Sequence, residues 1–209
     1  METNSLMLDT VLLPETKNLL EKITPEKLPE KTYLGGGTAI ALQLGHRRSV
    51  DLDFFTPTEF VERQWEEKLK KNFGFKLLKR DWQTLIGYIN EVKISLFAYK
   101  YRQIAPKKFY GKISIASLQD LAAMKLDTIL GRGTKRDLID IYFLSQKFTL
   151  PLLLTFYQKK YGNLEERELM LKKAFVFFND AEQDEMPDML MGIKWKDVKN
   201  YFLSETKKL

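Results

Sequence analysis

Three consecutive glycines, Gly35–Gly37, constrain the fold of this chain more than any other feature of its sequence. Glycine adopts backbone conformations that other residues avoid, so such a run forces a turn. It follows a strand-like segment at residues 31–34 and precedes a helical pattern at residues 38–44 that ends at Gly45. Residues 50–55 then return as a strand. We therefore expect a strand, a tight turn, a short helix and a second strand.

The pattern of strands and helices continues to about residue 98. Thr56-Pro57-Thr58-Glu59 resembles a capping box with proline at the first helical position. Apolar residues then recur at every fourth position up to Gly74, namely Val61, Trp65, Leu69 and Phe73. Residues 84–89 and 92–98 alternate as strands. Asn90-Glu91 is the expected hairpin turn between them.

After about Ser114 the sequence is typical of helices. Ser117 with Asp120, and Thr134 with Asp137, predict two helix starts. Further helices are expected at residues 165–178 and 195–203, on either side of an acidic connector at 180–188. The predicted fold class is therefore α+β. Residues 1–113 would form a small mixed sheet flanked by helices, and residues 114–209 a mainly helical lobe that completes a cleft.

The composition limits the kinds of site that this chain can build. With 209 residues, 44% hydrophobic and 12% aromatic, the chain can bury a real core. It has no cysteine and a single histidine, His46, which excludes disulfides, thiolate metal sites and histidine-rich zinc sites. Any metal ion must therefore be held by oxygen atoms.

The sequence contains no feature that directs it to a membrane. Its first residues, METNSLMLDTVLLPETKN, lack the basic start and the long apolar run of a signal peptide. No stretch of about 18 apolar residues occurs. We therefore expect a cytoplasmic protein without a membrane partner. The net charge of +6, from 34 basic and 28 acidic residues that are well mixed, permits an anionic partner such as nucleotide or RNA but does not identify one.

Asp51 and Asp53 are the first candidates for chemistry. They lie two positions apart on the expected strand, so their carboxylates share one face while Leu52 and Phe54 point to the other. An exposed sheet face or a strand end would also tolerate two such charges. The pair taken alone therefore leaves a structural role open.

The glycine turn before this strand strengthens the functional interpretation. Gly36 and Gly37, followed by Thr38 at a helix start, would let backbone N–H groups approach the phosphates of a nucleotide. A plain tight turn is the alternative. Arg47 and Ser49 lie between this turn and the aspartates. Phosphates and a metal ion could thus meet in a single cleft.

A second candidate region begins at Ser117. Lys125 falls on the apolar face of the expected helix, where its ammonium group either extends to the helix edge or points into a cleft toward phosphates. Asp137 and Asp140 lie one turn apart on the next helix. Asp137 could act in catalysis or in helix capping, and Asp140 could pair with Arg132 or Arg136.

Taken together, these motifs resemble those of a known family. The run Leu34–Leu42 with His46–Phe55 resembles the first motif of the AbiEii/AbiGii-type toxin nucleotidyltransferases, within the DNA polymerase beta-like superfamily. Asp120–Lys125, Arg132-Gly133 and Lys135–Tyr142 resemble that family's later motifs, in the same order. The resemblance spans roughly residues 34–144.

The resemblance implies a two-lobed enzyme that transfers a nucleotide from an NTP. By this resemblance Gly36, Gly37, Thr38, Arg47, Ser49 and Lys125 would bind the nucleotide, Asp51 and Asp53 would bind Mg²⁺ or Mn²⁺, and Lys125 and Asp137 would complete the catalytic set. Relatives in the family act as toxins of toxin–antitoxin pairs, and some add nucleotides to tRNA. The implied partners are an NTP donor, tRNA or another RNA as acceptor, and a cognate antitoxin.

One position departs from the superfamily pattern. A third carboxylate usually lies on a later strand, and the matching position here is Ser95. That carboxylate often binds metal or accepts the proton of the attacking hydroxyl, so we expect Asp137 to replace it. The alternative is a degenerate nucleotidyltransferase fold that binds nucleotide or a partner protein without turnover.

Overall fold

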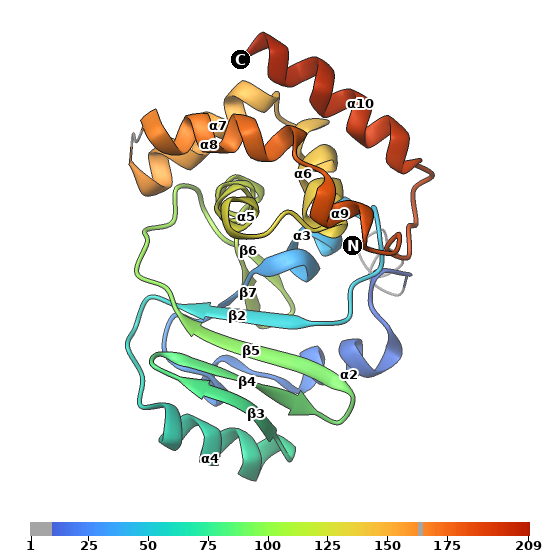
Figure 1. Ribbon diagram of the computed structural model, residues 1–209. Coiled ribbons are helices and arrows are strands. Elements are labelled where there is room, and N and C mark those ends of the chain that lie inside the picture. The colour runs from blue at the N-terminus through green and yellow to red at the C-terminus, as the bar shows by residue number, and fades with distance from the viewer. Residues whose placement is uncertain (1–9, 163–164) are drawn as a thin grey trace.

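The computed structural model describes residues 10–162 and 165–209. A sheet of seven strands crosses the molecule, with helix α4 on one side and most of the remaining helices on the other (Figure 1). The first nine residues, which begin the segment examined for a signal peptide, lie outside the described range. No helix in the described part of the chain combines the length and the apolar character needed to cross a bilayer.

The described elements follow one another along the chain with short connections. The strands are β1 (Tyr33–Leu34), β2 (Leu52–Thr56), β3 (Lys76–Asp81), β4 (Thr84–Ile89), β5 (Val92–Ala98), β6 (Lys108–Tyr110) and β7 (Ile113–Ile115). The helices of the first half are α2 (Pro14–Lys22), η1 (Pro25–Lys27), α3 (Gly36–Leu44) and α4 (Glu62–Phe73). Those of the second half are α5 (Leu118–Gly131), α6 (Lys135–Ser145), α7 (Leu150–Tyr161), α8 (Glu165–Val176), α9 (Asn179–Glu182), α10 (Trp195–Glu205) and η2 (Thr206–Lys208).

The order of the strands places β2 at the centre of the sheet. The order is β3-β4-β5-β2-β1-β7-β6, with β2 parallel to β5, β1 parallel to β7, and the other pairs antiparallel. Leu52 and Phe54 are fully buried on one face of β2, as their alternation with the aspartates predicts. The central strand therefore carries the residue between them, Asp53, on its opposite face.

The α+β class and the mixed sheet flanked by helices are confirmed, but the sheet is larger than expected. Strands β3, β6 and β7 were not predicted, because every residue of β3 is exposed and β6 and β7 have three residues each. The edge strands β3 and β6 lack the alternation in burial that marks a half-buried strand, and β7, which does alternate, is too short to be recognised. The expected lobe boundary between residues 113 and 114 falls inside β7.

The predicted capping box at residues 56–59 is wrong. Thr56 ends β2, and α4 begins six residues later, at Glu62. The Thr56 hydroxyl donates to the Glu30 carbonyl at 2.7 Å and accepts from the Thr58 N–H at 3.1 Å. These bonds form a local turn and replace the capping interaction, since a threonine side chain serves a turn as readily as a helix start.

The two helix starts predicted in the second half are confirmed. Ser117 Oγ accepts the Asp120 N–H at 3.0 Å, and Thr134 Oγ1 accepts the Asp137 N–H at 3.3 Å. Helix α5 packs against α3, α6, α7 and α8 and is the central helix of this part of the molecule. The two capped starts fix the rotation of α5 and α6 about their own axes. This rotation decides which polar side chains of the two helices point toward the sheet.

Candidate active site

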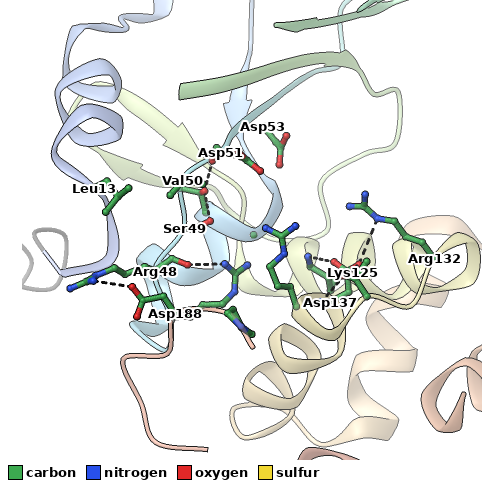
Figure 2. A pocket seen from close by; sticks show the side chains of 16 residues that line it. Leu13, Arg48, Ser49, Val50, Asp51, Asp53, Lys125, Arg132, Asp137 and Asp188 are labelled. Atoms are coloured by element: carbon green, nitrogen blue, oxygen red, sulfur yellow. Dashed lines mark hydrogen bonds and ion pairs between the residues drawn. The ribbon is translucent and has the colours of Figure 1, made fainter. Parts of the chain in front are cut away.

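Asp51 and Asp53 lie at the edge of the central strand where the sheet meets the helices. Asp53 belongs to β2 and Asp51 precedes its first residue, so the strand begins two residues later than expected. Figure 2 shows both side chains on one wall of a pocket, with Lys125, Asp137 and Arg132 on the facing wall. The shared face that the sequence predicted therefore opens into a cavity.

Asp53 is packed between the glycine turn and strand β5. A Cβ atom on Gly36 would lie 2.3 Å from its Oδ2, and Gly36 has a positive φ of 63°. Only glycine suits this position on both grounds. Ser95 is the register partner of Asp53 on β5 and forms a hydrogen bond with its carboxylate. Burial raises the pKa of Asp53, the Ser95 hydrogen bond opposes this effect, and the nearby Asp51 charge adds to it.

The glycine turn also shapes the start of helix α3. Gly35 N–H donates to the Asp53 carbonyl at 2.8 Å, which ties the turn to the strand. The first N–H groups of a helix have no acceptor within the helix, and no side chain caps those of α3. They can therefore bind oxygen atoms of a ligand. At Gly37 a Cβ atom would lie 2.4 Å from Arg47 Nη2. The missing side chain makes room for the guanidinium group beside the helix start.

Thr38 and Ser49 lie at this site, but their hydroxyls have protein partners. Their oxygens are 2.7 Å apart, and Thr38 Oγ1 also donates to the Asp51 carbonyl. Both residues are buried. Their hydroxyls therefore hold the backbone of Asp51 against α3, and contact with a phosphate would come from the backbone at Thr38.

Lys125 lies on the facing wall in a buried ion cluster. Its Nζ is 2.9 Å from Asp137 Oδ1 and 3.0 Å from Asp140 Oδ2. Burial alone would lower the pKa of Lys125, but Asp140 and Asp137 raise it, so the ammonium group stays charged. Asp137 Oδ2 accepts the Thr134 hydroxyl at 2.6 Å, so both Asp137 oxygens have partners. Lys125 thus extends neither to the helix edge nor freely into the cavity.

Asp140 is the centre of this cluster and has no exposed surface. Arg47 approaches it through Nε at 2.7 Å and Nη2 at 3.0 Å, and His46 Nε2 lies 2.8 Å from its Oδ1. Burial alone would raise the pKa of Asp140, but Lys125 and Arg47 hold it well below its usual range. Asp140 does not form the pairing with Arg132 or Arg136 that the sequence left open, because its carboxylate turns inward, toward α3.

Two adjoining cavities meet at the aspartates. The first, about 290 Å³, is polar, and we call it the arginine chamber; it is lined by Leu13, Gly37, Thr38, Arg47, Arg48, Ser49, Val50, Asp51, Asp53, Lys125, Arg132, Thr134, Arg136, Asp137, Pro187 and Asp188. The second, about 540 Å³, we call the aromatic chamber. It shares Gly37, both aspartates, Lys125, Arg132 and Arg136 and adds Phe55, Phe97, Tyr99, Tyr161, Met124, Lys93 and Ser95, among others. Their sizes are those of small-molecule sites.

Sequence comparison assigns the chain to a family. Residues 18–109 match the family described as "Nucleotidyl transferase AbiEii toxin, Type IV TA system", in which TA stands for toxin–antitoxin. Over 202 residues the chain is 33% identical to an uncharacterized protein of Aquifex aeolicus (strain VF5), covering 94% of this chain and 96% of that protein. The chain belongs to the AbiEii family. It is therefore a nucleotidyltransferase of a toxin family, as the motifs predicted.

Solved structures have the same fold at low sequence identity. MenT4, a nucleotidyltransferase toxin from Mycobacterium tuberculosis H37Rv, has a TM-score of 0.61 at 17% identity, with 93% of this chain and 84% of that chain covered. JHP933 from Helicobacter pylori has a TM-score of 0.54 at 14% identity, with 93% and 90% covered. These similarities confirm the nucleotidyltransferase-like α+β fold over most of the chain.

The structure adds residues to the AbiEii site that the sequence did not assign. His46 and Asp140 belong to the ion cluster, and Tyr99 and Tyr161 line the aromatic chamber. The sequence did single out Asp140, one helical turn after Asp137, but offered it only a pairing with Arg132 or Arg136. The two tyrosines, 62 positions apart, carried no such signal.

The donor set at the aspartates fits a hard divalent cation. Among the residues that the structure describes, no three acidic or histidine side chains lie close enough together to hold a metal ion by themselves. Asp51 and Asp53 supply two carboxylates, with the Ser95 hydroxyl beside them. Mg²⁺ is commonly held by one or two carboxylates together with substrate phosphates, so this AbiEii site suits an ion that arrives with a nucleotide.

Proposed function

We propose that this protein transfers a nucleoside monophosphate from an NTP to the end of an RNA acceptor, with tRNA as the leading candidate. One observation carries the proposal: Asp51 and Asp53 lie where an arginine-lined cavity over a helix start meets an aromatic cavity. This arrangement suits a reaction in which a triphosphate and a hydroxyl approach one point from two sides. The antitoxin of the pair and a cytoplasmic location, where NTPs and tRNA occur, belong to the same proposal.

In this proposal the triphosphate binds in the arginine chamber. The uncapped N–H groups at the start of α3, around Gly36 and Gly37, donate to phosphate oxygens. The Arg47 guanidinium lies beside them, held in place by Asp140. Such fixed donors stabilise the charge of the departing pyrophosphate without reorganisation during the reaction.

Asp51 and Asp53 would hold the divalent ion, which neutralises phosphate charge when it is bound. Lys125 faces the same space from α5, as a cation fixed by Asp137 and Asp140. We assign Asp137 the positioning of Lys125, in place of the proton acceptor role predicted from sequence, because both of its oxygens already have partners. Arg132 and Arg136 are exposed at the rim of both chambers and supply further positive charge.

The test is transfer of label from each of four α-labelled NTPs, with Mg²⁺, to total RNA or purified tRNA. We expect label to migrate with RNA for one or a few NTPs, and to disappear when Asp53→Asn replaces the wild type. Calorimetry of NTP binding is run on the same samples. NTP binding without any labelled product would contradict the proposal and favour a fold that binds nucleotide without turnover.

A further inference from the structure

A continuous series of aromatic rings leads from the aromatic chamber to the surface. The ring centroids of Phe55 and Tyr99 are 5.5 Å apart, those of Tyr99 and Tyr101 5.2 Å, and those of Tyr101 and Tyr161 4.6 Å. Tyr101 is 47% exposed, whereas Phe55, Tyr99 and Tyr161 line the chamber. Tyr101 therefore forms the outer end of the series, at the mouth of the cavity.

Cations without acidic partners lie on and beside the loop that carries Tyr101. Within the described residues, no carboxylate lies within 4 Å of the charged groups of Lys31, Arg102, Lys107 and Lys159, the group that we call the loop cations. Lys107 Nζ donates to the Lys31 carbonyl at 3.2 Å. Burial lowers the pKa of Lys107, the Asp120 charge opposes this effect, and the Lys31 charge adds to it. The loop cations thus include neighbouring like charges that an anion would stabilise.

The loop of residues 99–107, which carries Tyr101, Arg102 and Lys107, is held in place by a buried ion pair. Asp120 accepts the Ile104 N–H at 3.0 Å and the Ala105 N–H at 3.2 Å, and its Oδ1 is 2.7 Å from Lys160 Nζ. Lys160 also donates to the Arg102 carbonyl at 3.1 Å. Figure 1 shows the loop passing from β5 toward β6 along one side of the molecule, between the sheet and the helices. The surface is therefore formed in advance, which lowers the entropic cost of binding.

The mouth of the arginine chamber differs in charge. There Arg48 is paired with Asp188 at 2.9 Å, and Pro187 and Asp188, the end of the acidic segment 180–188, line the chamber. Arg132 and Arg136 border both chambers, and Asp127 of the aromatic chamber is paired with Arg167, so the two sides differ in the unpaired loop cations, which lie beside the aromatic rings. The charge distribution favours one direction of approach for the acceptor.

We propose that the loop cations and Tyr101 form the track for a single-stranded RNA end, whose terminal bases stack on the rings and whose hydroxyl reaches the aspartates from the aromatic chamber. This inference rests on the proposed function and adds the form of the acceptor and its route. Exposed rings stack on unpaired bases of any sequence, whereas a paired base in a duplex has no free face. Lysine and arginine beside the rings bind the phosphates.

The first test measures the binding of a fluorescent single-stranded RNA to the full chain without NTP, over a range of salt concentrations. In the variant Arg102→Ala/Lys159→Ala, the slope of log affinity against log salt is expected to become shallower by about 1.4, since each phosphate contact on a single strand contributes about 0.7. Lys70→Ala/Lys71→Ala is the matched control, because it removes two exposed positive charges from α4, on the other side of the sheet. Equal slopes for the two double variants would overturn the track.

The second test concerns the ring at the mouth. Tyr101→Ala is expected to weaken single-stranded RNA binding about tenfold, and Tyr101→Phe to retain it, because stacking needs the ring and not the hydroxyl. Truncation of this half-exposed side chain leaves the core intact, which circular dichroism checks. A blunt duplex of the same sequence should bind the wild type more weakly than the single strand. Equal binding of duplex and single strand, or an unaffected Tyr101→Ala variant, would contradict the proposal.

Transfer assays on the same variants separate this inference from the proposed function. If the wild type transfers label to RNA and Arg102→Ala/Lys159→Ala does so with an unchanged KM for RNA, the track is wrong and the function stands. If the wild type transfers nothing but binds RNA through the track, the proposed function is wrong. A raised KM for RNA, with an unchanged KM for NTP, supports both and identifies the aromatic side as the acceptor side.

Discussion

The two chambers that meet at Asp51 and Asp53 are built on different physical principles. In the arginine chamber, Arg47, Lys125 and Arg48 are each held by a carboxylate of the protein. In the aromatic chamber the walls are rings, and burial raises the pKa of the Tyr99 and Tyr161 phenols so that they stay neutral. Fixed charges suit a small ligand that binds in one geometry, and ring surfaces suit a strand whose bases vary.

The largest expected effect is at the junction of the chambers. Asp53→Asn should lower the rate of transfer by at least about a thousandfold, since metal and charge stabilisation contribute several kcal/mol to such reactions. The same change should raise the thermal stability of the metal-free protein at pH 7 by roughly 3 °C. Kinetics and calorimetry on one preparation measure both.

The sign of the stability effect follows from the direction of the pKa shift. The folded pKa of Asp53 is raised above 3.8, so the native state binds this proton more tightly than the unfolded chain. The free energy of unfolding therefore falls as the pH rises from about 3.8 through the folded pKa, and it stays lower at pH 7. The Asp53→Asn variant avoids this loss, so the melting temperatures of the wild type and the variant should converge in acid. Addition of Mg²⁺ should stabilise only the wild type, and equal stabilisation of both proteins would move the metal site elsewhere.

A second prediction tests whether the arginine chamber depends on its internal carboxylates. Asp140→Asn leaves Arg47 and Lys125 with less compensating charge inside the protein, and we expect the free energy of unfolding at pH 7 to fall by about 3–5 kcal/mol. Because the folded pKa of Asp140 lies well below its usual value, its contribution is present above about pH 4 and is lost as the pH falls through the folded pKa. Urea unfolding at pH 7 and in acid measures the difference.

The matched control is Asp188→Asn in the same chamber. The carboxylate of Asp188 pairs with Arg48 at the surface and is 62% exposed, so its loss should cost at most about 1 kcal/mol. The RNA affinity of Asp140→Asn should equal that of the wild type under conditions where it is folded. If instead RNA binding falls with NTP binding, the division of labour between the chambers is wrong.

The smallest effect is expected at Ser95. Ser95→Ala removes the hydrogen bond that opposes the rise in the pKa of Asp53, so protons compete more strongly with a metal ion for this carboxylate. We expect Mn²⁺ affinity to fall about tenfold, in the range typical of residues that support a metal ligand. The loss should be larger at pH 6 than at pH 8, and titrations at the two values check it. An equal loss at both would mean that Ser95 acts as a direct ligand.

The sequence predicted local features well wherever one residue type determined the geometry. The positive φ at Gly36 and the serine and threonine caps of α5 and α6 follow from single residues and their neighbours. The Asp-x-Asp pattern predicted a shared face because alternation along a strand is a property of the backbone. The exposed strand β3 and the three-residue strands β6 and β7 gave no comparable pattern.

The sequence could not predict how the charged residues pair. Lys125 stood out as a lysine on an apolar face, but its partners, Asp137 and Asp140, depend on how α5 and α6 pack. For the same reason the contact between Arg47 and Asp140, 93 positions apart, was not expected. Pair interactions between distant segments are set by tertiary packing, and no local pattern encodes them.

The pairs that build the arginine chamber also govern when the enzyme can first become active during its synthesis. Arg47 is held by Asp140, and Arg48 is paired with Asp188, which lies 140 positions later in the chain. At about 5–20 residues per second, a ribosome takes roughly 7–30 seconds to cover that interval. Until then the nascent chain has the aspartates but no finished chamber beside them. Nucleotide transfer by this chain would thus begin only after most of its length has been made.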